Sequence, residues 1–287
     1  MIYDRRADEL IDHKDFGGSQ TNFLYSTVVG RILLSFISSK TFSNMRAKYY
    51  SHSRSIKMIK KIEEAYNIDK DEYAKKSFKS FDDFFIRKLK PEARPFSSKP
   101  TDFIAPADSK LTYKKISEQL TINVKGGTYS IADMLDDADV ASAYNGGACL
   151  IFRLSMDDCH RYIFPDSGTL VWTKTIAGKL HTIQPIAHRK YKPYIRNYRV
   201  ISNLQTKRFG DIIVVEVGAL LVGRIKNHNK IQFKKGDEKG YFKLGGSTII
   251  VLLKPKTIKI DSDIMYYSKK SIETKVKQGE TIGALYV

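Results

Sequence analysis

Apolar residues recur at helical spacing in the first hundred residues of the chain. In residues 22–38 they follow an i, i+3, i+4 pattern, which predicts one amphipathic helix. The apolar stripe of this helix consists of Tyr25, Val28, Val29, Ile32, Leu33 and Phe36. Similar spacing predicts helices over residues 55–68 and 80–89, and Pro91 ends the second of these.

The pattern changes after Pro91. Residues 90–100 contain three prolines and predict an extended connection. Beyond it, short runs rich in branched apolar residues are separated by Gly, Asn and Asp, which predicts strands. These runs are residues 149–154, 211–217, 219–225, 247–253 and 257–260. Only residues 132–144 predict a helix in this part, and the closing residues 276–287 predict a hairpin like that of lipoyl-type barrels.

We therefore expect an α+β fold with two regions. Residues 1–98 form an N-terminal helical, membrane-associating region, and residues 99–287 form a β-rich catalytic domain. Hydrophobic residues make up 42% of the chain and charged residues 28%, a balance typical of a folded globular protein. The two cysteines, Cys149 and Cys159, have no CxxC spacing and argue against a disulfide scaffold or a structural zinc site.

The net charge and its distribution along the chain indicate a class of binding partner. The net charge of +18 implies an anionic partner: nucleic acid, acidic lipid or a phosphorylated substrate. No acidic residue occurs between Phe16 and Ile62, a stretch that contains Arg31, Lys40, Arg46, Lys48, Arg54, Lys57, Lys60 and Lys61. Two interpretations of this stretch remain open. It is an ordinary helical subdomain that packs on its own core, or a basic amphipathic surface that lies on an anionic membrane.

Other partners and locations are less well supported by the sequence. A nucleic-acid-binding protein would carry an RNP, KH or zinc-finger pattern, and the basic stretch here has no interleaved stacking aromatics. No uncharged run reaches the roughly 18 to 20 residues of a spanning helix, and the N-terminus lacks the apolar centre of a signal peptide. We expect a peripheral membrane protein at the cytoplasmic face of the cell membrane.

Three residues are candidates for chemistry. Asp108 lies in IAPADSK, His160 in MDDCHRYIFP and Ser247 in KLGGSTIIVLL. Each also has a plain structural explanation, because Asp and Ser shape turns and a histidine after a strand often satisfies a local hydrogen bond. There is no GxSxG motif, P-loop, HExxH motif or dinucleotide-binding glycine motif.

Together these residues belong to a longer series of motifs. The chain contains, in order, FFIRKLKPEARPF, IAPAD, DDCHRYIFP, VEVGALLVGRI, KKGDEKGYFKLGGST and VKQGETIGALYV. This series resembles the phosphatidylserine decarboxylase family over essentially the whole chain, and the shorter bacterial type II members most. The resemblance implies a carboxy-lyase of phospholipid biosynthesis, made as a proenzyme, that converts phosphatidylserine to phosphatidylethanolamine and carbon dioxide.

The resemblance also implies how the enzyme is made. Ser247 attacks the carbonyl of Gly246, His160 accepts the serine proton and Asp108 orients the imidazole. The chain is cut into residues 1–246 and 247–287, and Ser247 becomes a covalent pyruvoyl group, the only cofactor, with no metal and no pyridoxal phosphate. Its ketone forms a Schiff base with the serine headgroup and accepts electrons as carbon dioxide leaves.

Two positions depart from the family pattern. Many members have a second histidine three residues after the first, where this chain has Ile163, so His160 serves both steps or His181 in KLHTIQPIA supplies an accessory imidazole. Ser109 stands where glycine commonly follows the PAD motif.

The expected partners are phosphatidylserine in an anionic membrane, the two fragments of the cleaved chain and a second copy in a homodimer. The alternatives are an unprocessed membrane-binding pseudoenzyme and a pyruvoyl decarboxylase of a soluble amino acid.

Overall fold

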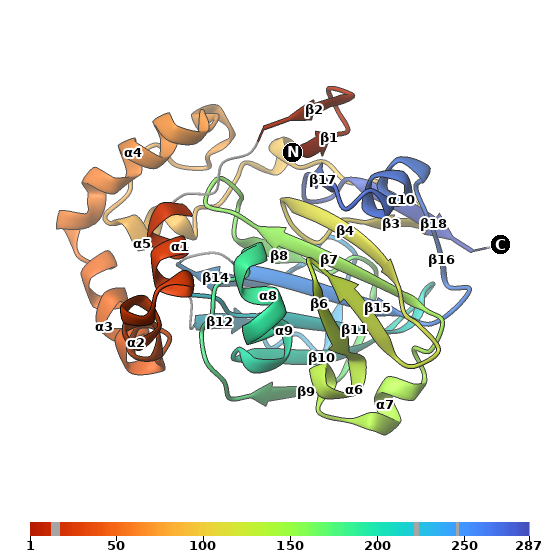
Figure 1. Cartoon of the computed structure of the whole chain (residues 1–287). Coiled ribbons are helices and arrows are strands. Elements are labelled where there is room, and N and C mark those ends of the chain that lie inside the picture. The colour runs from red at the N-terminus through yellow and green to blue at the C-terminus, as the bar shows by residue number, and fades with distance from the viewer. Residues whose placement is uncertain (13–17, 221–223, 245–246, 287) are drawn as a thin grey trace.

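The computed structural model describes residues 1–12, 18–220, 224–244 and 247–286. Helices of the N-terminal part gather on one side of the molecule, and the strands lie on the other side together with shorter helices (Figure 1). The described helices are α1 (Gly18–Ser26), α2 (Val28–Ile37), α3 (Lys40–Tyr50), α4 (Lys57–Tyr66), α5 (Phe81–Phe85), α6 (Ile131–Leu135), α7 (Ala138–Ser142), α8 (Pro185–Tyr191), α9 (Pro193–Arg196) and α10 (Ser262–Lys269). Short 3-10 turns cover Ser53–Ile56, Lys70–Glu72 and Pro91–Ala93.

Most strands belong to one large sheet with the order β13-β9-β10-β11-β15-β7-β4-β17-β1-β2. Its strands are β1 (Ile2–Asp4), β2 (Glu9–Ile11), β4 (Ser109–Lys115), β7 (Ala148–Leu154), β9 (Gly168–Ile176), β10 (Arg199–Thr206), β11 (Gly210–Val217), β13 (Gln232–Phe233), β15 (Ser247–Leu253) and β17 (Glu273–Val276). Only the β1–β17 pair in this sheet is parallel. The strand order has two ends, so the sheet is open and forms no barrel within the described residues.

Three smaller sheets complete the β-structure. They contain β12 (Arg224–Asn227), β14 (Glu238–Lys243) and β8 (Arg161–Ile163); β16 (Ile258–Ile260), β18 (Thr281–Leu285) and β3 (Asp102–Ile104); and β5 (Thr121–Val124) with β6 (Gly127–Ser130). The mixture of helices and sheets agrees with the α+β prediction. The runs over residues 149–154, 211–217, 247–253 and 257–260 are confirmed as strands. The run over residues 219–225 is only partly a strand, and residues 221–223 lie outside the described ranges.

The central strand β15 is apolar at every position after Thr248 because it is buried on both faces. Ile249 and Val251 pack into the core on one face of the sheet, and Ile250 and Leu252 pack into the core on the other. A strand buried on both faces needs no polar alternation. β15 therefore lies at the centre of the protein, between β11 and β7.

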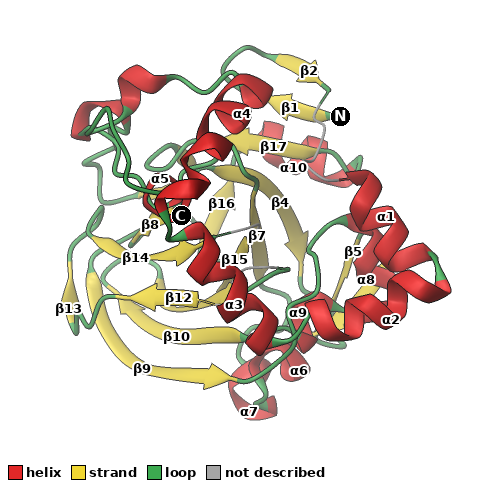
Figure 2. Cartoon of the chain, turned by 90° about the vertical axis from the view of Figure 1, so that its left-hand side faces the viewer, coloured by secondary structure: helices red, strands yellow, loops and turns green. Residues whose placement is uncertain are grey.

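The predicted helix over residues 22–38 is two helices. The Thr27 side chain accepts a hydrogen bond from the Gly30 backbone N–H at 2.9 Å and so begins α2 as its N-cap. A Cβ atom at Gly30 would lie 2.1 Å from the Phe23 carbonyl oxygen, so only glycine permits this close approach of α1 and α2. Helix α3, which its weak apolar pattern did not predict, follows α2 and crosses in front of the strands in Figure 2.

The expected apolar stripe is mostly exposed. Tyr25 is buried, but the other five members of the stripe, all on α2, are between 45% and 67% exposed. No helix within the described part of the chain is both long enough and apolar enough to cross a bilayer. The stripe is therefore a surface feature of short helices lying beside the sheet.

Two predictions for the second half of the chain are wrong. Residues 132–144 are not its only helix: this segment forms α6 and α7, and α8, α9 and α10 follow. Helices α8 and α9 begin at Pro185 and Pro193 and are too short to show an apolar period. The predicted terminal hairpin does not form either, because β17 pairs with β4 whereas β18 pairs with β3. The turn between them, with Gly279 at φ +83°, instead wraps around residues 105–108.

The first strand links the two ends of the chain. β1 lies beside β17 in the large sheet, so the region expected to be helical also contributes strands to the β-rich part. The boundary between residues 98 and 99 stays a prediction.

Candidate active site

Two neighbouring connections between strands bring His160 and Ser247 to one part of the molecule. Residues 155–160 lead from β7 to β8, and residues 244–246 lead from β14 to β15. β7 pairs with β15 and β8 pairs with β14. The strand ends that one connection joins therefore lie beside the strand ends that the other joins. Ser247 is paired with Leu154, and the His160 carbonyl accepts a hydrogen bond from the Phe242 N–H at 2.9 Å. The other half of the predicted cleavage site, Gly246, lies outside the described residues.

His160 is held as a neutral base. Its ring is fully buried and packs on Phe85, with 3.8 Å between ring centroids. Nδ1 lies 3.0 Å from the Asp158 carbonyl oxygen, which can only accept, so Nδ1 carries the hydrogen and Nε2 has the free lone pair. Burial, with the positive charge of Arg87, lowers the pKa of His160 to about 3. The imidazole is therefore uncharged at neutral pH, and its Nε2 carries an unshared lone pair.

Ser247 and His160 share an unusual feature. The Ser247 hydroxyl oxygen and His160 Nε2 are both buried, and neither has a hydrogen-bond partner among the described residues. Buried polar atoms are rarely left unpaired, and exceptions are enriched at functional sites. The predicted nucleophile and the predicted base are thus both unpartnered, and they are not hydrogen-bonded to each other in this structure.

The loop that carries His160 is fixed from two directions. Lys110, a buried residue of β4, binds the Asp157 and Asp158 carboxylates at 2.8 Å each. The Arg87 guanidinium donates to the backbone carbonyls of the same two aspartates, at 3.0 and 3.3 Å. Lys110 and Arg87 were not among the residues predicted from the sequence. The paired Asp157 and Asp158 shortly before a histidine were the available signal.

Asp108 is buried nearby but engaged elsewhere. Arg94 binds both carboxylate oxygens, at 2.8 and 2.7 Å, and the Gln278 N–H donates to one of them at 2.8 Å. Burial opposes ionisation, but these bonds and the Arg94 charge keep the pKa of Asp108 below its usual range. The Asp158 carbonyl, and not Asp108, orients the His160 ring in this structure. A catalytic role for Asp108 stays a prediction, now with Arg94 as its direct partner.

His181 is placed among tyrosines. Its Nδ1 is 3.4 Å from the Tyr25 hydroxyl, and its ring packs on Tyr191 with 4.6 Å between centroids. Burial lowers the pKa of His181 to about 4. No interaction joins it to His160 or Ser247 within the described ranges. Ile163, which replaces the second histidine, is a buried residue of β8 whose N–H binds the Pro106 carbonyl at 2.9 Å.

A cavity of about 570 Å³ lies between the N-terminal helices and the end of the large sheet. Leu154, the strand partner of Ser247, and Leu244, three residues before Ser247, both line it. More than half of its other lining residues are apolar, and they come from all five N-terminal helices and from the connections that follow β7, β9 and β11. The cavity therefore offers an apolar molecule a place beside Ser247.

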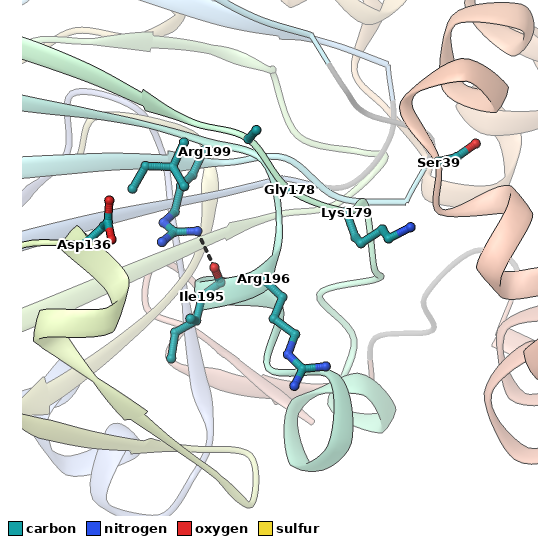
Figure 3. Close-up of a pocket in the computed structure, with 9 residues that line it drawn as sticks. Ser39, Asp136, Gly178, Lys179, Ile195, Arg196 and Arg199 are labelled. Atoms are coloured by element: carbon teal, nitrogen blue, oxygen red, sulfur yellow. Dashed lines mark hydrogen bonds between the residues drawn. The ribbon is translucent and has the colours of Figure 1, made fainter.

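A second, open groove of about 530 Å³ has no lining residue in common with this cavity (Figure 3). It is lined by Lys179, Arg196 and Arg199 among others. The Arg199 guanidinium donates to the carbonyls of Asp133, Met134, Ile195 and Asn197, so it ties the ends of α6 and α9 to β10. None of the predicted site residues lines this groove.

No cluster of three or more His, Cys, Asp or Glu side chains is arranged to hold a metal ion in the described ranges. The predicted site residues Ser247, His160 and Asp108 supply a hydroxyl, a neutral imidazole and an ionised carboxylate.

Comparison with known proteins identifies the family of this chain. The sequence model for phosphatidylserine decarboxylase matches residues 81–284. The chain is 49% identical to phosphatidylserine decarboxylase proenzyme 2 of Clostridium acetobutylicum over 283 residues, which cover 98% of this chain and 97% of that protein. It is 40% identical to the phosphatidylserine decarboxylase proenzyme of Clostridium perfringens over 289 residues, 98% of each chain. It is 38% identical to that of Ruminiclostridium cellulolyticum over 290 residues, 99% of this chain and 97% of that protein. The resemblance inferred from the motifs is confirmed, and the chain belongs to the phosphatidylserine decarboxylase family.

Proposed function

We propose that this protein cleaves itself between Gly246 and Ser247 and then decarboxylates phosphatidylserine to phosphatidylethanolamine. The observation that carries the proposal is the pair of buried, unpartnered atoms, the Ser247 hydroxyl oxygen and His160 Nε2. The matching family and the proenzyme names of the relatives support it.

Self-cleavage uses groups of this chain alone. His160 Nε2 takes the hydroxyl proton while the Ser247 oxygen attacks the Gly246 carbonyl carbon. The C–N bond breaks, the released amine takes a proton, and an ester joins the two parts. Loss of the Ser247 α-proton then breaks the Cβ–O bond, leaving a carboxylate on Gly246 and dehydroalanine at position 247. Addition of water and loss of ammonia leave a pyruvoyl group on residues 247–287.

The surroundings of Ser247 fit such a group. Residue 247 begins β15, is fully buried and borders the apolar cavity through Leu154 and Leu244. The pyruvoyl group supplies a ketone that bonds to the substrate amine and draws electrons away as carbon dioxide leaves. His160, being neutral with a free Nε2, holds and returns the proton that the substrate carbon needs after carbon dioxide has left. Arg94 keeps the Asp108 carboxylate ionised at the edge of the site.

The two fragments stay together after cleavage. Residues 247–287 supply β15, β16, β17, β18 and α10, and β15 lies between two strands of the large fragment. Removing it would expose both faces of the core, so the fragments form one unit. The same proposal includes a homodimer, which the family resemblance implies. The mass of the protein in solution tests whether it is a dimer.

Intact mass and product analysis of the purified protein test the proposal. We expect fragments of residues 1–246 and 247–287, the second with a pyruvoyl cap in place of its amino terminus, and release of carbon dioxide from phosphatidylserine. A full-length chain without activity would identify a pseudoenzyme, and a full-length active chain would refute the pyruvoyl mechanism. Decarboxylation of free serine but not of the lipid would favour a soluble substrate.

A membrane surface is the second part of the proposal. The exposed apolar residues of α2 lie on the same group of helices as the exposed cations Lys48, Arg54, Lys57 and Lys60. An apolar face among basic residues is typical of helices that lie on anionic lipid. The protein is accordingly peripheral, at the cytoplasmic face of the cell membrane.

Binding to vesicles checks this surface. We expect binding to vesicles with phosphatidylserine that weakens as salt rises, since each basic residue near the surface contributes about 1 kcal/mol. Ile32→Asp should weaken it strongly, whereas Val171→Asp, at an exposed apolar position of β9, should not. Equal loss in both variants, or equal binding to neutral vesicles at every salt concentration, would count against the surface.

A further inference from the structure

We propose that Arg46 binds the phosphodiester group of the substrate and thereby makes this site specific for a phospholipid. The inference rests on the proposed function and adds the recognition residue that the function leaves open. Arg46 lies on α3, on the wall of the cavity beside Ser247.

The charge of the cavity wall is the first observation. Among the described residues that line the cavity, Arg46 and Arg153 are the only charged ones, and no acidic residue lines it. An apolar cavity with cationic side chains suits a molecule that has both apolar chains and an anionic group. A phospholipid has both.

Arg153 has its donors engaged already. Its Nη2 binds Glu273 Oε2 at 2.6 Å, its Nε binds the same carboxylate at 2.9 Å, and its Nη1 donates to the Ser155 hydroxyl at 3.0 Å. The contacts of Arg153 with Glu273 and Ser155 fix the edge of β7. It is therefore poorly suited to bind a ligand.

Arg46 has donors to spare. Arg46 forms no ion pair within the described residues, and its Nε is buried without a hydrogen-bond partner. Its Nη2 donates to the hydroxyl of Tyr50, one turn later on α3, and its guanidinium carbon lies 5.0 Å from the centroid of the Tyr50 ring. Tyr50 thus holds the guanidinium in place while leaving its charge uncompensated. A buried donor of this kind needs an anionic acceptor.

The phosphodiester is the anion that fits the reaction. The substrate carries a carboxylate and a phosphodiester, but only the phosphodiester survives into the product. An arginine that paired with the carboxylate would hold it back from leaving as neutral carbon dioxide. A bond to the phosphodiester is the same before and after reaction, so it contributes to binding and not to the chemical step.

Kinetics with a dispersed short-chain phosphatidylserine test this assignment without a membrane. In Arg46→Gln we expect KM to rise roughly ten- to hundredfold with kcat within about twofold of wild type, the range of a lost hydrogen bond to a charged group. Inhibition by short-chain phosphatidylethanolamine should weaken by the same factor. Arg46→Lys keeps the charge and should recover part of the loss.

Lys259→Gln is the matched control, because it removes the same charge from an exposed position of β16, outside the N-terminal helices. Intact mass must show that each variant is cleaved, which separates recognition from folding and self-cleavage. An unchanged KM in Arg46→Gln, a fall in kcat alone, an unchanged inhibition by the product, or an equal rise of KM in Lys259→Gln would each overturn the assignment. Failure of the wild-type protein to decarboxylate the lipid would instead refute the proposed function.

Discussion

Ser247→Ala protein is expected to remain one chain of 287 residues and to release no carbon dioxide. Alanine has no hydroxyl to attack Gly246, and without that attack neither the ester nor the ketone can form. The loss of activity should be complete, because no other group described near this site replaces an electrophilic carbonyl. Intact mass and carbon dioxide release from phosphatidylserine measure the two effects.

The fold of this variant should be intact. The Ser247 hydroxyl has no hydrogen-bond partner in the described structure, so its removal breaks none, and the midpoint of thermal unfolding should match that of other uncut variants. Ser247→Cys is the companion variant: a thiol forms the corresponding thioester, and slow cleavage is expected. Cleavage of Ser247→Ala at the rate of wild type would exclude Ser247 as the nucleophile.

The strands were predictable where burial alone decided the sequence. β15 and β7 are apolar on both faces because both faces meet a core, and that pattern is visible without a structure. The break between α1 and α2 was not predictable from periodicity, since Thr27 and Gly30 act through a local cap and a close helix contact. The terminal hairpin failed for a related reason: β17 and β18 pair with β4 and β3, and pairing across the chain leaves no local signal.

The candidate site was likewise only partly predictable from the sequence. Asp108, His160 and Ser247 were found through motifs, but their hydrogen-bond partners come from distant segments. Arg94 reaches Asp108 from the connection before β3, and Lys110 reaches the loop before His160 from β4. Ion pairs between distant residues depend on the fold, so the sequence did not predict that Asp108 binds Arg94 or that the Asp158 carbonyl orients His160.

The surroundings of the two candidate histidines predict different effects of replacing them. His160 has a free, buried Nε2 and a lowered pKa that keeps it neutral. His181 has a similarly lowered pKa, but its ring contacts Tyr25 and Tyr191 and it has no interaction with Ser247 among the described residues. Only His160 is therefore expected to serve as the base for self-cleavage.

His160→Gln should accumulate as an uncut chain, whereas His181→Gln should be cleaved at close to the wild-type rate. A positioned general base contributes roughly 10²- to 10⁴-fold, so the cleavage half-time of His160→Gln should lengthen by at least about a hundredfold. Glutamine roughly preserves the volume of the ring in both variants, which limits the cavity that alanine would leave. A time course of intact mass after synthesis of the chain measures both rates.

Normal cleavage of His160→Gln together with failure of His181→Gln would transfer the role of base to His181. Failure of both would mean that both imidazoles take part in self-cleavage. Cleavage of His160→Gln followed by loss of decarboxylation alone would confine His160 to the second reaction.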